Sequence, residues 1–280
     1  MAILQSSPVQ EAPLLVIMWA CLSACAGLPL EPRSAVTLER AWGVAGGPTE
    51  EDAQGLVRMV EHVLPFYRVL DGFEERPLRA HMTSFAEGSK WEGITVEPLT
   101  GPPWLAVARE AEFLELAVAH ELAHFYFEKQ QARFPSVLEE GLCDLLAGQV
   151  YDDREYYSKR LMIAGLAYLD PRKFSLDDPR HAPAIEDLRA SALGVQEALA
   201  LTTAELVSVK RTTLISCYGL GYVLARQIGW EGIVILLRRA DLENRDRVPA
   251  AWILEQAGLS PPYDQGLREI LLQEWQRVQP

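Results

Sequence analysis

Basic residues are scarce in this sequence. The 26 Lys and Arg are outnumbered by 39 Asp and Glu, which gives a formal net charge of −13. A nucleic-acid-binding protein needs a basic surface to meet the phosphates, so this balance argues against such a partner. Gly and Pro, at 19 and 18 residues, are too few for a collagen-like or low-complexity chain. Hydrophobic residues make up 49%, too many for a disordered chain, and 280 residues suffice for one large domain or two small ones.

Long hydrophobic runs are almost absent. Only residues 14–28, LLVIMWACLSACAGL, form an uncharged stretch long enough to consider as a membrane segment, so the sequence argues against a polytopic membrane protein. Apolar residues fill about 12 positions of this stretch before small residues take over. A helix of that length crosses a bilayer poorly and suits the hydrophobic region of a signal peptide better.

The same stretch contains the sequence LSAC, which ends at Cys25. It resembles the lipobox of bacterial lipoproteins, in which an aliphatic residue and two small residues precede the cysteine that is lipidated. The resemblance implies a signal peptide over residues 1–24 and a lipid anchor on Cys25. The location would be the bacterial cell envelope, at the outer membrane or the periplasmic face. The segment before the apolar stretch contains Glu11 and no Lys or Arg, unlike a usual signal peptide, so an N-terminal anchor helix or a buried hydrophobic arm remain alternatives.

The rest of the chain predicts an α+β domain behind a tether. Residues 25–48 are rich in Pro, Gly and Ala, and we expect a tether with weak local structure. The domain then covers residues 49–280. It divides into a small α/β portion at 49–109, which carries the strands, and a mainly helical portion at 110–280.

Start and stop signals place the first elements of this domain. Thr49 is a helix N-cap followed by three acidic residues, and Asp71 and Gly72 end the helix. Short runs of mixed apolar and polar residues then predict strands at 78–85, 94–96 and 104–107. From Glu110 onward the pattern is helical almost to the end of the chain.

The most informative segment is HELAH, from His120 to His124. Two histidines four residues apart lie on one face of a helix, so both imidazoles can reach the same metal ion. The carboxylate of Glu121 can reach a water in the open position of a zinc ion and act as a general base. The alternative is a pair of ordinary core histidines in a helix that matches by chance.

A second helix supplies a third candidate ligand. Glu140 follows His124 by enough residues for the first helix to end near Phe134 and Pro135 and a second helix to return. Two histidines and one glutamate are a common ligand set for catalytic zinc. Asp144 lies one turn after Glu140, where it can accept the second N–H of a ligating histidine. The alternative for both acids is a solvated helix surface, which is also the expected position of Glu139.

HELAH followed by LEEGLCD resembles the gluzincin superfamily of zinc metallopeptidases. The resemblance implies one Zn²⁺ per chain, held by His120, His124 and Glu140, with Glu121 as the base and Asp144 behind a ligand. It also implies a strand-bearing layer before the zinc helix and a helical lobe after it. The chain departs from the larger families because it has no G-x-M-E-N motif, and the spacing to Glu140 is a little short. It is more similar to small gluzincin-like peptidases of bacterial envelopes.

The remaining candidates carry weaker signals. Tyr218 is our choice of oxyanion donor. Tyr222 lies on the same helix face, and the glycines at 219 and 221 would allow close approach to the active-site helix. The alternative is a packed core helix. His181 is a surface histidine or a further donor, and His62 and His81 are structural or exposed. Cys143 and Cys217 are more readily explained as two buried thiols than as a disulfide.

The sequence therefore predicts a membrane-tethered zinc metallopeptidase that acts on a peptide or protein substrate. Two alternatives remain. One is a non-catalytic envelope lipoprotein that uses a zinc-binding scaffold of the same kind. The other is a zinc amidase that acts on cell-wall material.

Overall fold

The computed structural model describes residues 31–85, 93–96, 102–151, 211–261 and 263–278. The predicted signal peptide, Cys25 and His181 lie outside the described residues, as do the side chains of Cys217 and Tyr218. The chain divides into two units, Met1–Arg33 and Ser34–Pro280. Everything below concerns the second unit, which contains five strands and six helices in its described part. The α+β class is thus as predicted.

The strands form one mixed sheet in the order β1-β2-β3-β5-β4. β2, β3 and β5 run parallel to one another, and β1 and β4 pair antiparallel at the two edges. The three strands predicted from the sequence are present. The five have these bounds: β1 Val36–Arg40, β2 Gly43–Gly47, β3 Leu78–Thr83, β4 Gly93–Val96 and β5 Trp104–Ala108.

The tether predicted over residues 25–48 needs a correction, because β1 and β2 fall inside it. Its glycines suggest a flexible segment, but in β2 a glycine allows the neighbouring strand to approach closely. Gly43 has a φ of +144°, and a Cβ at this position would lie 2.0 Å from the carbonyl oxygen of Leu78 in the neighbouring strand. Only glycine permits this approach. The folded domain therefore begins before residue 49.

The first helix, α2 (Glu50–Tyr67), begins as predicted at Thr49. The Thr49 hydroxyl accepts from the backbone N–H of Asp52 at 3.2 Å, and the Asp52 carboxylate accepts from the backbone N–H of Thr49 at 3.1 Å. This reciprocal pair is a capping box, which satisfies two backbone donors at the helix start. The helix ends at Tyr67, with Arg68 as its C-cap, a few residues before the predicted stop at Asp71.

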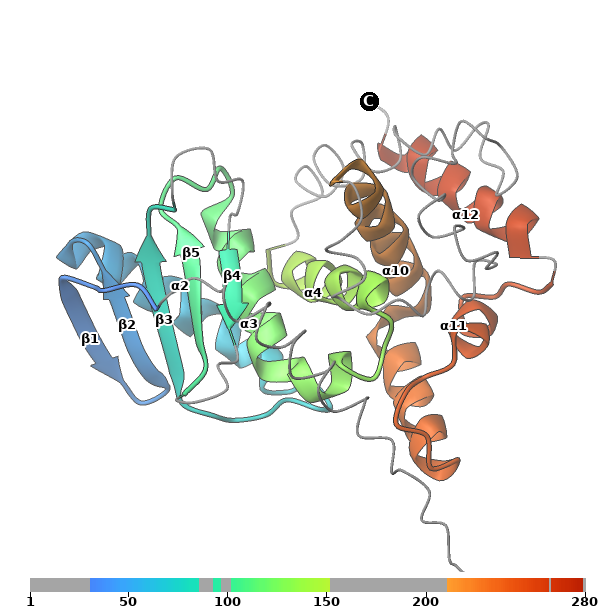
Figure 1. The fold of residues 1–280 in the computed structure, drawn as a ribbon, viewed down its shortest axis with the longest axis horizontal. Coiled ribbons are helices and arrows are strands. Elements are labelled where there is room, and N and C mark those ends of the chain that lie inside the picture. Colours follow the sequence, from blue (N-terminus) through green and yellow to red (C-terminus); the bar gives the residue numbers. More distant parts are fainter. Residues whose placement is uncertain (1–30, 86–92, 97–101, 152–210, 262, 279–280) are drawn as a thin grey trace, which may run out of the picture. The chain divides into compact units, whose positions relative to one another are not determined.

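The remaining helices follow the sheet in sequence. α3 contacts both α2 and β5, α4 lies between α3 and α10, and α11 and α12 contact α10 (Figure 1). The turn between α3 and α4 lies at the predicted Phe134 and Pro135. Their bounds are α3 Leu114–Gln131, α4 Ser136–Tyr151, α10 Arg211–Leu242, α11 Ala250–Gln256 and α12 Tyr263–Val278.

One helix in the described part of the chain is long and apolar enough to span a membrane by length and composition. It is the segment Leu220–Leu242 of α10, and 61% of its most apolar window is buried inside the protein. The expectation that residues 14–28 are the only stretch long and apolar enough to consider as a membrane span is therefore wrong. Side chains such as Leu224, Ile233 and Leu236 belong to the same hydrophobic core as α3 and α4. Such burial is typical of a core helix.

Candidate metal centre

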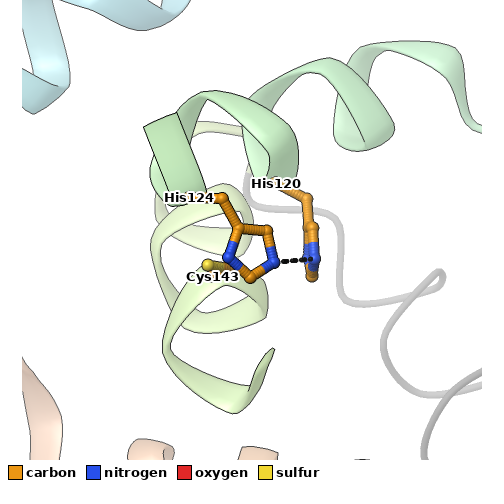
Figure 2. A group of neighbouring side chains, drawn as sticks. All are labelled: His120, His124 and Cys143. Atoms are coloured by element: carbon orange, nitrogen blue, oxygen red, sulfur yellow. Dashed lines mark hydrogen bonds between the residues drawn. The ribbon is translucent and has the colours of Figure 1, made fainter. Parts of the chain in front are cut away.

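His120, Glu121 and His124 project from the middle of α3, a helix buried along most of its length. The hydroxyl of Tyr67 in α2 donates to the carbonyl oxygen of Ala119 at 2.9 Å, which fixes the helix just before the first histidine. The two imidazole rings have centroids 4.9 Å apart, and their Nε2 atoms are 3.2 Å apart (Figure 2). The HELAH spacing therefore brings one nitrogen of each ring together.

The other ring nitrogen of each histidine has its own partner. His120 Nδ1 is 2.8 Å from Oδ1 of Asp144, and His124 Nδ1 is 3.1 Å from Oε1 of Gln131. Both partner oxygens are hydrogen-bond acceptors, so the imidazoles donate through Nδ1. In the neutral tautomer, each Nε2 then carries a lone pair that points into the space between the rings.

Glu140, on α4, reaches the same space. Its Oε2 lies 3.2 Å from Nε2 of His120 and 3.5 Å from Nε2 of His124. Asp144 lies one turn later on α4, and its Oδ1 contacts Nδ1 of His120, the ring nitrogen that faces away from His124. The structure thus brings into contact, on two helices, four of the side chains that the sequence singled out: His120, His124, Glu140 and Asp144.

Cys143 is a further potential metal donor. One possible ligand atom from each of His120, His124 and Cys143 lies within 4.8 Å of the others, so this group could hold a metal ion. Cys143 is a free cysteine with a fully buried side chain, as expected for a buried thiol. In Figure 2 its sulfur lies beside the nitrogen of His124 that faces away from His120.

Glu121 lies beneath the edge strand β4. Thr95 donates a hydrogen bond from its hydroxyl to Oε2 of Glu121 at 2.7 Å, and this hydroxyl is also 3.0 Å from the backbone carbonyl oxygen of Glu121. Gly93 permits the close approach, because a Cβ there would lie 2.5 Å from Cγ of Glu121. The carboxylate is only 7% exposed. β4 therefore holds this side chain in place.

Burial and mutual charge both perturb the site. Burial raises the pKa of Glu121 and of Asp144, although the neighbouring histidines oppose the rise. Burial also acts to raise the pKa of Glu140, but His124 and His120 outweigh it and hold that pKa well below its usual range. Burial acts to lower the pKa of both histidines. At His120, the carboxylates of Asp144 and Glu140 outweigh the effect of burial. At His124, Cys143 and Glu140 do so. The pKa values of both histidines therefore lie well above the ordinary value for histidine. The surroundings of the two rings thus favour positive charge on the imidazoles.

Glu139 differs from the expectation of a solvated surface acid. Its side chain is 27% exposed, and its Oε1 lies 3.9 Å from Nδ1 of His124. Tyr222 is buried, and burial raises its pKa to about 12. The glycine at 221 does allow close packing, but against Gly141 of α4 rather than against α3. His62 is exposed, as expected.

His81, the remaining described histidine, is buried, with its Nδ1 3.0 Å from the hydroxyl of Ser34.

Two residues of the site were not predicted from the sequence. Gln131 forms a hydrogen bond with Nδ1 of His124, and the Thr95 hydroxyl donates one to the Glu121 carboxylate. Neither stands in a motif, and each reaches the site only through tertiary structure. Thr95 belongs to a predicted strand, but its sequence gives no sign that the strand contacts α3.

Comparison with known proteins gives no match: no family model, no curated protein and no solved structure matches this chain.

Proposed function

We propose that this protein is a zinc-dependent metallopeptidase of the gluzincin type. The observation that carries the proposal is the convergence of three electron-pair donors. Nε2 of His120, Nε2 of His124 and Oε2 of Glu140 are separated by 3.2, 3.2 and 3.5 Å. Ligands of a tetrahedral zinc ion lie about 3.3–3.6 Å from one another, because each bond is about 2.0–2.2 Å long. Three such donors repel one another unless a proton or a metal ion lies among them.

Glu140 is a better third ligand than Cys143. Both histidines donate through Nδ1 and present Nε2 to the centre, so a third ligand must approach the two Nε2 atoms. Oε2 of Glu140 does so. The Cys143 sulfur lies on the Nδ1 side of His124 and accepts a hydrogen bond from Gln131 at 3.0 Å. Two histidines and one carboxylate also leave the fourth position open, as catalytic zinc requires.

Glu121 is the proton carrier in this proposal. A bound zinc ion would polarise the substrate carbonyl and make water acidic enough to react near neutral pH. Glu121 accepts the proton from that water and later delivers it to the leaving amine. Its burial raises its pKa, which improves its ability to bind a proton between these two events. Thr95 keeps Oε2 of the carboxylate in one orientation.

The edge strand β4 suits an extended peptide substrate. It is the last strand of the described sheet, and its residues Gly93 and Thr95 both contact Glu121. A peptide that paired its backbone with this edge would pass beside the base. Tyr218 stays our choice of oxyanion donor, and we further propose that Cys25 tethers the enzyme to a membrane of the cell envelope through its lipid.

The test replaces Glu121 by glutamine, which keeps the shape of the side chain but removes its basicity. Glu121→Gln should retain about one zinc per chain and lose hydrolysis of a diverse peptide library. His124→Ala should lose both. Glu115→Gln is the matched control, since Glu115 is an exposed carboxylate on the same helix. Undiminished hydrolysis by Glu121→Gln would contradict the proposal.

The wild-type protein separates the two alternatives in the same assay. Stoichiometric zinc without turnover of peptides or cell-wall fragments would identify a binding scaffold. Turnover of cell-wall fragments alone would identify an amidase.

A further inference from the structure

Gln131 is a buried amide whose position calls for an explanation. It is the last residue of α3, its side chain is 1% exposed, and it lies seven residues after His124. In a straight helix, seven residues span about 10.5 Å along the axis, too far for one side chain to reach the other. Yet Oε1 of Gln131 lies 3.1 Å from Nδ1 of His124.

A kink in α3 makes this contact possible. Phe127 has φ −121° and ψ 18°, outside the helical range, so the last turn of α3 leaves the axis of the zinc-binding turns. Near the kink, backbone carbonyl oxygens of α3 accept hydrogen bonds from groups that are not part of the regular backbone pattern of the helix. The backbone N–H of Glu74 donates to the carbonyl oxygen of Tyr126 at 3.0 Å, and the side-chain NH₂ of Gln131 donates to the carbonyl oxygen of Ala123 at 3.1 Å. Both of these carbonyl oxygens, which precede Phe127, therefore have a hydrogen-bond donor at the kink.

The partners of Gln131 fix which way its amide faces. The carbonyl oxygen of Ala123 can only accept, so the NH₂ group of Gln131 must face it. Oε1 then faces His124 and can only accept, which requires the proton of the neutral imidazole to lie on Nδ1. The lone pair of His124 is consequently on Nε2, the nitrogen that faces His120 and Glu140.

The same NH₂ group lies 3.0 Å from the sulfur of Cys143. This contact holds the sulfur beside Nδ1 of His124, whereas Oε2 of Glu140 lies beside the two Nε2 atoms. A thiolate binds zinc well, so an unrestrained Cys143 would compete with Glu140 for the metal.

We propose that Gln131 is a positioning residue with two effects: it selects the metal-binding tautomer of His124, and it keeps Cys143 out of the coordination sphere. The inference depends on the zinc site of the proposed function, but not on peptide hydrolysis. Gln131 does for His124 what Asp144 does for His120, from a position that no motif marks.

The test measures zinc affinity by competition with a chelator, in the full chain. Gln131→Met keeps the length of the side chain and removes both polar groups. In a Cys143→Ser background, where no thiolate can take over as a ligand, this change should lower the zinc affinity about 10–100-fold. Gln131→Glu keeps an acceptor for Nδ1 of His124 and should therefore retain most of the zinc affinity. Gln54→Met is the matched control, since Gln54 is an exposed glutamine of α2. Equal affinities of Cys143→Ser and of Gln131→Met combined with Cys143→Ser would overturn the proposal.

Cobalt substitution provides the second measurement. Co²⁺ in the wild-type protein should show no sulfur-to-metal absorption in the near ultraviolet, and the spectrum of Cys143→Ser should be the same. Gln131→Met should gain this absorption. A sulfur band in the wild-type protein would overturn the proposal even if Gln131→Met failed to fold. Zinc binding that depends on Gln131 without any peptide hydrolysis would refute the peptidase function and leave this inference standing.

Discussion

Replacing Gly141 by alanine should destabilise the protein, although the same change at an exposed helix position is stabilising. Gly141 follows Glu140 in α4 and packs directly against α10. A Cβ at this position would lie 2.2 Å from the carbonyl carbon of Gly221 and 2.4 Å from the backbone nitrogen of Tyr222. Because both neighbours are backbone atoms, no side-chain rotation relieves the contact.

The expected size follows from this overlap. Ordinary contact begins at 3.4 Å, so α4 and α10 must separate by roughly 1 Å. Overpacking costs about 1–3 kcal/mol, and a clash between backbones belongs at the upper end of that range. The better helix propensity of alanine offsets about 1 kcal/mol. The free energy of unfolding should therefore fall by about 2 kcal/mol, which lowers the Tm by about 4–8 °C.

Thermal and urea unfolding of Gly141→Ala beside Gly55→Ala would check this reasoning. Gly55 lies in α2, and the only atom within 4 Å of a Cβ there is an Arg58 guanidinium nitrogen at 3.8 Å. Gly55→Ala should raise the free energy of unfolding by about 0.5–1 kcal/mol. Equal stability of Gly141→Ala and the wild type would refute the close contact between the two helices.

Three further substitutions test single contacts. Asp144→Asn removes the negative charge behind His120 and should weaken zinc affinity about 10–100-fold in a chelator competition; an unchanged affinity would contradict this contact. Thr95→Val removes the donor to Glu121 and should lower kcat about 10-fold with zinc content unchanged, whereas loss of zinc would argue for a different role. Tyr67→Phe removes the side-chain donor to the Ala119 carbonyl oxygen and should lower the free energy of unfolding by about 1 kcal/mol in urea; no change would contradict a stabilising role for this hydrogen bond.

Local periodicity explains how much of the site could be predicted. The four-residue spacing of HELAH places both histidines on one helix face, and the same spacing relates Glu140 to Asp144. These relations need only a helix. Gln131 could not be predicted, because it reaches His124 only through the kink at Phe127.

The fold was predictable where side-chain pattern determines structure. The capping box at Thr49 and the apolar strand β5 follow from residue type. β1 and β2 were missed because the glycines of β2 are read from sequence as a loop signal. Their role depends on the approach of Leu78 from another strand, which is a tertiary contact.

The most direct test of the central claim is metal analysis of the purified full chain. The wild type and His62→Ala, which replaces an exposed histidine outside the cluster, should each contain about one zinc per chain. His120→Ala should contain almost none, with its fold checked by circular dichroism. Equal zinc content in His120→Ala and the wild type would contradict the account.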